Sequence, residues 1–434
     1  MKVKEILLLI FIIIAGVVFY YAQTGKFHIE WNLGDYFFFG GEEFTFEESQ
    51  VIDPPLPPLF KISNAHGIVE IQGTEESQMT ISFQKKIWRK NEEEAKKVSR
   101  ELQMKIQKND LQIWLTTNRE EFRRRNFETN FKITLPRNMD IEVQNSYGLV
   151  SVSKVRSASV NNRHGKIIAS DIDGKLTLQN SYEDVEIGNV SADCNIESRH
   201  SDIMANGIKG KATIIHKYGK IHLEDVSNGV MIDGSHSEIF GQRISGSSEA
   251  KSSYEKISLI DVGPTKIDGH HCDLEIDRAK EYLEIIDSYG TIKLSNIEGN
   301  LIVKGRNVEC SAKRIVGKEI SISTTYRNID LADFAGKTII SLSHGDVTLE
   351  PSLLSYPIEV RGEYSNISFY WPRGEKNPFE ARTRNGEIQW KLAEELSFQE
   401  ENHETIVKAF LEEKEKPSIF LSTSYGDIHI EELH

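Results

Sequence analysis

Histidine and tyrosine alternate at a nearly fixed spacing along this chain, and a row of histidines is a pattern that can bind metals or carry acid–base chemistry. If each repeat adds one strand to a parallel stack, neighbouring histidines lie two strand spacings apart, ~9.6 Å, with a tyrosine between them. That distance is too long for two imidazoles to share a metal ion. We therefore predict a structural ladder of rings at one corner of the fold, and neither a metal site nor a catalytic row. The ladder positions, which stand mostly 17 or 18 residues apart and twice hold asparagine, are Tyr147, His164, Tyr182, His200, Tyr218, His236, Tyr254, His271, Tyr289, Asn307, Tyr326, His344, Tyr364, Asn385 and Tyr425.

Two carboxylates are the best candidates for glycan-cleaving chemistry, which requires acidic groups that converge on one face. Asp184 and Asp202 each stand two places after a ring and would stack on adjacent coils. Lys166 and Lys220 occupy the same place in the flanking repeats, and most neighbours are opposite in sign along the row of Lys166, Asp184, Asp202, Lys220, Glu238, Lys256 and Asp273. Because opposite charges on adjacent strands stabilise a sheet, this is the pattern of a solvated, charge-balanced face. We predict no catalytic residue and no enzyme activity.

The cysteines do not form a disulfide pattern. Cys194, Cys272 and Cys310 are odd in number and fall at different phases of the repeat. An exported protein held by disulfides shows an even, patterned set. We predict three buried free thiols, no bound metal and no cofactor.

The overall charge argues against one class of partner. The formal net charge is −14 and the pI is about 5.5. Nucleic-acid binding depends on clustered Lys and Arg, and the one tight basic run, Arg123 to Arg125, is typical of a solvated loop. Nucleic acid is therefore excluded as the main partner.

Aliphatic residues follow each ring at fixed offsets, which predicts the element that positions the ladder. Further apolar residues stand five and eight places after each ring, with small residues such as Ala205 facing bulky ones such as Leu223 on the next repeat. Alternation of period two with a fixed repeat predicts an all-β parallel β-helix, a solenoid. The charge alternation and the small–large layers favour about 18 residues per coil over 36. The column three places after the ring is Val150, Ile167, Val185, Ile203, Ile221, Ile239, Ile257, Leu274, Ile292, Cys310, Ile329, Val347, Ile367, Ile388 and Ile428.

The segments outside the repeat predict an anchor and two end structures. The apolar run from Ile6 to Ala22 is long enough for a transmembrane helix; a cleaved signal peptide is the alternative, although Tyr20 stands where a small residue should be. Residues 79–135 predict a strand, a short helix and a hairpin, a small α+β cap. Residues 398–417 predict a helix that carries Ile406, Val407, Phe410 and Leu411.

The predicted divisions are a cytoplasmic stub at 1–5, a transmembrane anchor at 6–22, a juxtamembrane segment and proline-rich linker at 23–59, an N-terminal cap and first coil at 60–140, β-helix repeats at 141–395, and a helical insertion with the terminal coil at 396–434.

The order of these motifs resembles a known family. "ISNAHGIVEIQG", then the strand and helix region, then "ITLPRNMDIEVQNSYGLVSVSKV" and the repeated turns resemble the bacterial putative adhesin domain, a family of unknown function built from β-strand repeats. The resemblance extends from Phe60 to His434. It implies an exported or membrane-anchored bacterial protein with a β-helical body, and it brings no catalytic residues.

The sequence therefore favours a non-enzymatic scaffold in the cell membrane: a single-pass anchor with its N-terminus in the cytoplasm, and a periplasmic or extracellular rod that binds an envelope or surface protein or a glycan. Lys2 and Lys4 support this orientation. An ectodomain that senses or regulates envelope stress is the alternative function, and a polysaccharide-acting enzyme is less favoured.

Overall fold

The computed structural model describes residues 41–392, 397–401 and 404–433. The stub at 1–5, the apolar run at 6–22 and the start of the juxtamembrane segment lie outside this range. Within it, no helix is both long and apolar enough to cross a membrane. The described residues divide into two compact units. One contains residues 41–46, Lys85–Gln103 and Arg119–Glu128, and the other contains Glu47–Gln84, Met104–Asn118 and the described residues from Thr129 on.

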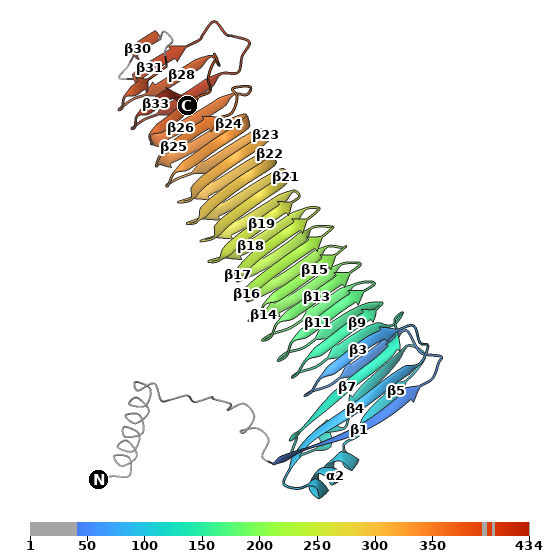
Figure 1. The fold of residues 1–434 in the computed structure, drawn as a ribbon. Coiled ribbons are helices and arrows are strands. Elements are labelled where there is room, and N and C mark those ends of the chain that lie inside the picture. Colours follow the sequence, from blue (N-terminus) through green and yellow to red (C-terminus); the bar gives the residue numbers. More distant parts are fainter. Residues whose placement is uncertain (1–40, 393–396, 402–403, 434) are drawn as a thin grey trace, which may run out of the picture. The chain divides into compact units, whose positions relative to one another are not determined.

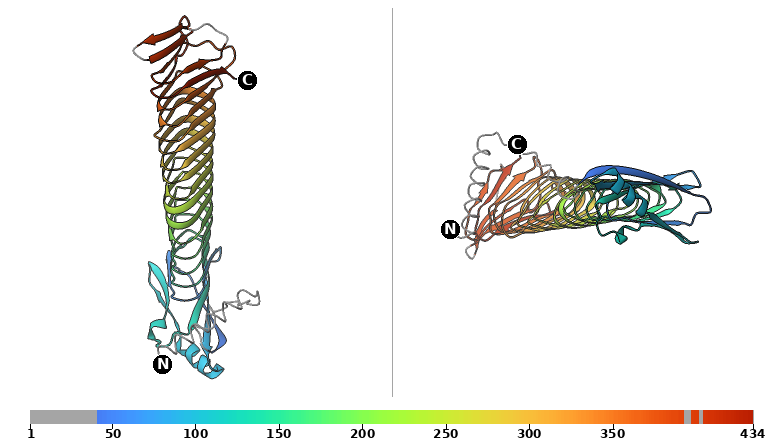
Figure 2. Two further views of the ribbon diagram at one scale, coloured as in Figure 1. Left: turned by 90° about the vertical axis from the view of Figure 1, so that its left-hand side faces the viewer. Right: turned by 90° about the horizontal axis from the view of Figure 1, so that it is seen from below.

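The larger unit is an all-β parallel solenoid, whose coils are stacked along one axis (Figures 1 and 2). Residues in adjacent coils pair at an offset of 18, as Ile167 pairs with Val185 and Ile203 with Ile221. The predicted coil of about 18 residues is confirmed, and the 36-residue alternative is wrong.

Each coil contributes two strands, one before the ring and one after it. The strands after the ring are β3 (Val69–Thr74), β9 (Val150–Val155), β11 (Ile167–Ile172), β13 (Val185–Val190), β15 (Ile203–Ile208), β19 (Lys256–Val262), β25 (Val347–Pro351), β27 (Ile367–Trp371), β29 (Ile388–Trp390) and β33 (Ile428–Glu432). The strands before the ring are β2 (Leu59–Ser63), β8 (Asp140–Gln144), β10 (Ser157–Asn161), β12 (Leu176–Gln179), β14 (Cys194–Arg199), β18 (Ser248–Ser253), β20 (Thr265–His270), β26 (Ile358–Tyr364), β28 (Phe379–Thr383) and β32 (Ile419–Thr423).

In the middle of the solenoid the two strands of a coil join into one long strand. Two of these, β16 (Ala212–Val226) and β17 (Val230–Ile244), run through the ring corner. The other four, β21 (Asp273–Ser288), β22 (Thr291–Arg306), β23 (Glu309–Thr324) and β24 (Ile329–His344), run through the opposite corner.

The core lies between the two strand columns. The predicted aliphatic columns after the ring are buried except at Ile388, which is half-buried. Small residues lie against large ones, as Ala205 pairs with Leu223 and Gly241 with Leu259. A Cβ on Gly241 would approach side-chain atoms of Leu259 and Ile244 to 2.8 Å, so the layers interlock as predicted. The strands before the ring supply a second apolar layer that the sequence analysis did not identify.

The N-terminal coils are not stacked in chain order. The outermost coil is formed by β6 (Gln112–Thr117) and β7 (Phe127–Pro136), which pair in parallel with β2 and β3. The coil of β2 and β3 pairs on its other side with β8 and β9. The predicted cap region thus closes the solenoid with a coil of its own.

The remaining N-terminal elements follow the predicted order. They include β4 (Met79–Arg89) and the hairpin of β5 (Met104–Lys108) with β6. The smaller unit contains α2 (Glu92–Glu101) and a 3-10 turn (Arg119–Glu121). The side chain of Asn91 accepts a hydrogen bond from the Glu94 amide at 2.9 Å and so caps α2. A further strand, β1 (Glu42–Ile52), pairs with β4 and was not predicted.

The predicted C-terminal helix is wrong. Residues 398–417 contain β30 (Ser397–Glu401) and β31 (Glu404–Ala409), which form an antiparallel hairpin, and β31 pairs with β28. The spacing of Ile406, Val407, Phe410 and Leu411 fits a helix locally. The segment forms strand β31 instead, because without it the outer backbone N–H and C=O groups of β28 would have no hydrogen-bond partners.

The predicted position of the last coil is also wrong. Strands β32 and β33, the last in the sequence, lie between the coil of β26 and β27 and the coil of β28 and β29. The final coil is therefore inserted, and an earlier segment forms the end of the stack.

Candidate functional site

The predicted ring ladder is present at one corner of every coil from His66 to Tyr289. Neighbouring rings stack with centroids 4.6–5.9 Å apart, and at most 30° from parallel. Asn307 interrupts the row, which resumes with Tyr326, His344, Tyr364 and Tyr425. The prediction of one Tyr–His ladder is confirmed.

The ladder exposes ring edges to solvent. Each inner ring has a neighbour on both faces, and the tyrosines are about half exposed, as at Tyr147 with 47% and Tyr254 with 54%. Sugar and cation recognition by aromatic side chains uses the ring face. In the part of the chain that the structure describes, no three histidine, cysteine or acidic side chains come together to hold a metal ion. The ladder therefore acts as a spine of the solenoid.

Behind the ladder lies a column of buried polar side chains, which we call the donor column. It consists of the polar residues that stand two places before most rings, and they differ too much in type to be recognised from the sequence. Glycine or leucine takes this place at Gly234, Gly269, Gly305, Leu342 and Gly362. Eight of the described members donate hydrogen bonds of 2.9–3.3 Å to the carbonyl at the place after the ring in the preceding coil of the stack. These donors and acceptors are Asn64 and Thr129, Asn145 and Gly67, Asn162 and Gly148, His216 and Ser201, Ser252 and Ser237, Thr324 and Val308, Thr383 and Gly426, and Thr423 and Ser365. Asn180 and Ser198 instead bind within their own coil.

His216 shows how the donor column works. Its Nε2 lies 2.9 Å from the Ser201 carbonyl and its Nδ1 lies 2.8 Å from the Ser237 hydroxyl. Because a carbonyl can only accept, Nε2 carries the proton and Nδ1 accepts from the hydroxyl. Burial lowers the pKa of His216, so the ring is held neutral.

A ladder of mostly charged residues occupies the opposite corner, seven places after each ring. Arg243 donates to Asp225 at 2.6 and 2.9 Å, and Arg278 donates to Asp261 at 2.5 and 3.0 Å. These guanidinium groups lower the pKa of Asp225 and of Asp261. The members with a left-handed φ of 52–58° are Lys154, Asp171, Asn189, Asp225, Arg243, Asp261, Arg278, Asn296, Arg314 and Asp333.

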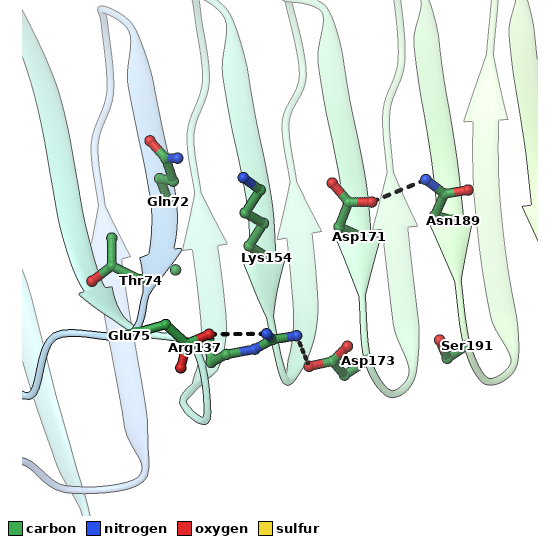
Figure 3. A pocket seen from close by; sticks show the side chains of 10 residues that line it. Gln72, Thr74, Glu75, Arg137, Lys154, Asp171, Asp173, Asn189 and Ser191 are labelled. Carbon is green, nitrogen blue, oxygen red and sulfur yellow. Dashed lines mark hydrogen bonds and ion pairs between the residues drawn. The ribbon is translucent and has the colours of Figure 1, made fainter.

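A recess of about 640 Å³ opens at the N-terminal end of this charged ladder (Figure 3). Arg137 crosses it and donates to Glu75 at 3.1 Å and to Asp173 at 3.0 Å. These two hydrogen bonds raise the pKa of Arg137. The residues that line the recess are Gln72, Gly73, Thr74, Glu75, Arg137, Lys154, Asp171, Asp173, Asn189 and Ser191.

The chemistry of the recess is that of a polar contact site. Asn189 donates to Asp171 at 2.9 Å, whereas Lys154 is exposed and has no ion pair or hydrogen-bond partner among the described residues. The hydroxyl groups of Thr74 and Ser191 line the recess without a histidine beside them. The charged and polar lining can therefore bind a polar ligand.

Comparisons with known proteins give one family match. Residues 60–235 match the family model described as Toastrack DUF4097. These residues form a Toastrack domain. The domain is one of unknown function, which agrees with the predicted resemblance to a family of β-strand repeats. The recess and the ladder rings from His66 to Tyr218 lie within the Toastrack domain, and the strand pairing continues the same repeat beyond residue 235.

No protein of established annotation matches the chain. A solved structure of a putative cell adhesion protein from Clostridium sporogenes ATCC 15579 aligns with 12% sequence identity over 90% of this chain and 100% of that chain, at a TM-score of 0.16. A score this low leaves the fold to be argued from the strand pairing alone.

The two candidate carboxylates accept hydrogen bonds from backbone amides within the Toastrack domain. Asp184 accepts from the Asp202 amide at 3.1 Å, and Asp202 accepts from the Lys220 amide at 2.9 Å. Lys220 also pairs with Glu238 at 3.2 Å, as the alternating charges predicted, whereas Lys166 pairs outside the row. Each carboxylate thus links two coils.

The prediction of three free, buried thiols is confirmed. Burial raises the pKa of Cys194 and of Cys310 to about 12, and it also raises the pKa of Cys272. A thiol with such a pKa is almost entirely protonated at neutral pH and is therefore a poor nucleophile.

Proposed function

We propose that this protein is a non-enzymatic scaffold, anchored in the membrane by residues 6–22, whose solenoid lies outside the cytoplasm and binds an envelope or surface partner. The proposal rests on one observation: in this regular solenoid, the side chains of each ladder contact other members of the same ladder or the main chain. Rings stack on rings, charged residues pair along the edge, and buried donors meet main-chain carbonyls. Side chains that already have partners within the fold in this way make the solenoid rigid.

The recess beside Arg137 is the proposed contact with the partner. It is polar, it lies at one end of the charged ladder, and Lys154 points a charge into it that no described residue neutralises (Figure 3). A polar or anionic group on a surface protein or glycan fits this lining, because an ammonium group binds such groups as a point charge.

The enzyme alternative finds less support. The carboxylates of Asp184 and Asp202 accept backbone amides on neighbouring coils, and a carboxylate occupied in this way is less suited to proton transfer. Turnover of an envelope glycan that is lost in Asp184→Asn or Asp202→Asn would favour the enzyme instead.

The proposal is tested by photocrosslinking in intact cells of the source organism. A crosslinking amino acid replaces Ser191, an exposed residue in the lining of the recess, in one strain, and in the control strain it replaces Lys318, an exposed lysine far along the solenoid. We expect a discrete adduct from position 191 but not from position 318. When Lys154→Glu is added to the strain with the crosslinker at position 191, the adduct should become several-fold weaker. The absence of an adduct from the recess, or equal adducts from both positions, would overturn the assignment.

A further inference from the structure

The donor column contains one residue that cannot donate in its ordinary charged form. Asp287 stands two places before Tyr289, with only 3% of its surface exposed. Its polar equivalents in other coils are asparagine, histidine, serine and threonine, all of which have a proton to give, whereas the coils on either side have Gly269 and Gly305 at this place. An ionised aspartate can only accept hydrogen bonds, so it cannot donate to a carbonyl as the other polar members of the column do.

The oxygens of Asp287 lack the contacts that a buried carboxylate needs. Neither oxygen makes a hydrogen bond of full geometry among the described residues, although the backbone amides of Ser288 and Cys272 lie close enough to favour the charged form. A Cβ built on Gly290 would collide with both Asp287 Oδ2 and the Cys272 carbonyl oxygen, so these two oxygens face the same small space. The Cys272 carbonyl is the acceptor that the pattern of the donor column assigns to this coil. Two acceptors in that position repel each other unless one of them carries a proton.

We propose that Asp287 is protonated and neutral in the folded solenoid, where its carboxyl O–H donates to the Cys272 carbonyl, and that release of this proton to water at higher pH loosens the coils on either side. The contact between the coils at Asp287 is then more stable in acid than at neutral pH.

Burial decides the direction in which the pKa of Asp287 shifts, because the groups around it act in both directions. Burial raises its pKa to about 6. Asp273, earlier on the same strand, also raises this pKa, whereas His270 on β20 and the backbone amides of Ser288 and Cys272 lower it. The residue opposite on β22 is Gly305, which brings no charge.

The sign of the effect follows from linkage. The unfolded chain releases the Asp287 proton near its ordinary pKa of 3.8, and the folded chain near 6. The stabilising effect of the neutral form is therefore complete below about pH 4 and is lost as the pH rises to about 6.

The test compares full-length protein in mild detergent with Asp287→Asn. The control is Asp268→Asn, which makes the same change at an exposed position of the preceding strand. At pH 7.5 we expect amides of residues 265–305 to open up to about 100-fold less often in Asp287→Asn than in wild type, because two pKa units correspond to two decades. At pH 4 the two proteins should be alike, and Asp268→Asn should follow wild type throughout.

Asp287→Leu separates the effect of the charge from that of the hydrogen bond, because leucine has neither a titratable group nor a donor. This variant should lose the pH dependence that Asp287 causes and should be less stable than Asp287→Asn. Carbon-13 NMR of the aspartate carboxyl groups in the wild-type protein gives a readout that does not depend on any variant folding. A signal that is absent from the Asp287→Asn spectrum should titrate near pH 6. Titration of that signal at or below pH 4, or equal local opening in Asp287→Asn and wild type at pH 7.5, would overturn the proposal.

Discussion

His216→Ala should destabilise the middle of the solenoid by about 2 to 4 kcal/mol, because it leaves a buried carbonyl without a donor and opens a cavity. The His216 ring is fully buried, and both of its nitrogens have partners at Ser201 and Ser237. His216→Asn should recover much of the loss, since asparagine fills the same place at Asn162 with a 2.9 Å hydrogen bond.

Hydrogen exchange measures this effect where it occurs. A loss of about 3 kcal/mol corresponds to roughly 100-fold faster opening of the amides in β14, β16 and β17, against about tenfold in His216→Asn. His222→Ala is the matched control, because His222 lies on the same strand and stacks on Phe240 at the surface. If His222→Ala loosens these strands as much as His216→Ala, or if alanine and asparagine at 216 behave alike, the role assigned to the donor column is refuted.

Three further predictions concern the ladder, the thiols and the anchor. Asn307→His should complete the ladder between Tyr289 and Tyr326 and raise the unfolding midpoint, by about 1 kcal/mol in free energy, because it adds two ring stacks; an unchanged or lower midpoint in denaturant titration would count against the spine role. Cys194 and Cys310 should resist alkylation at pH 7.5 until the protein is unfolded, as mass spectrometry of the labelled protein can show. Protease added outside a sealed inner membrane should digest the chain after Thr24, and full protection there would exclude the proposed orientation.

The pH dependence of His216 opposes that of Asp287. Burial lowers the pKa of His216 below 6.5, so the unfolded chain takes up a proton first and stability falls as the pH drops below 6.5. Asp287 adds stability over an overlapping range of pH as the pH drops below about 6. Only the difference between wild type and Asp287→Asn isolates the aspartate.

Much of the fold could be predicted from residues whose type repeats. The column of Val150 and Ile167 is aliphatic and follows a conspicuous ring, so both the coil length and the burial of this column follow from the sequence. The donor column escaped prediction because asparagine, histidine, serine and threonine share only a proton donor, and that likeness becomes visible once the acceptor carbonyls are placed.

The order of coils at the two ends could not be predicted, because local pattern carries no information on which coil is the neighbour. The segment from Ile419 to Glu432 has the repeat phase, and any open coil edge would accept it. The helix expected around Val407 fits the local spacing, but pairing of β31 with the edge of β28 overrides it. The recess depends on Arg137, which reaches across from the turn before β8, and its neighbours are 36 and 62 residues away in sequence.

The measurement that tests the scaffold most directly is deletion of whole coils. Removing Lys220–Glu255, two coils, joins Gly219 to Lys256 and keeps the ring order, the small–large layers and the recess. Removing Lys220–Asn228, half a coil, places corner residues over strand residues and polar side chains into the core. We expect the two-coil deletion to give a folded, strand-rich protein with a cooperative melt that still forms the adduct at position 191, and the half-coil deletion to aggregate. Equal behaviour of the two deletions, or a better-folded half-coil variant, would contradict the account of a rod built from interchangeable 18-residue coils.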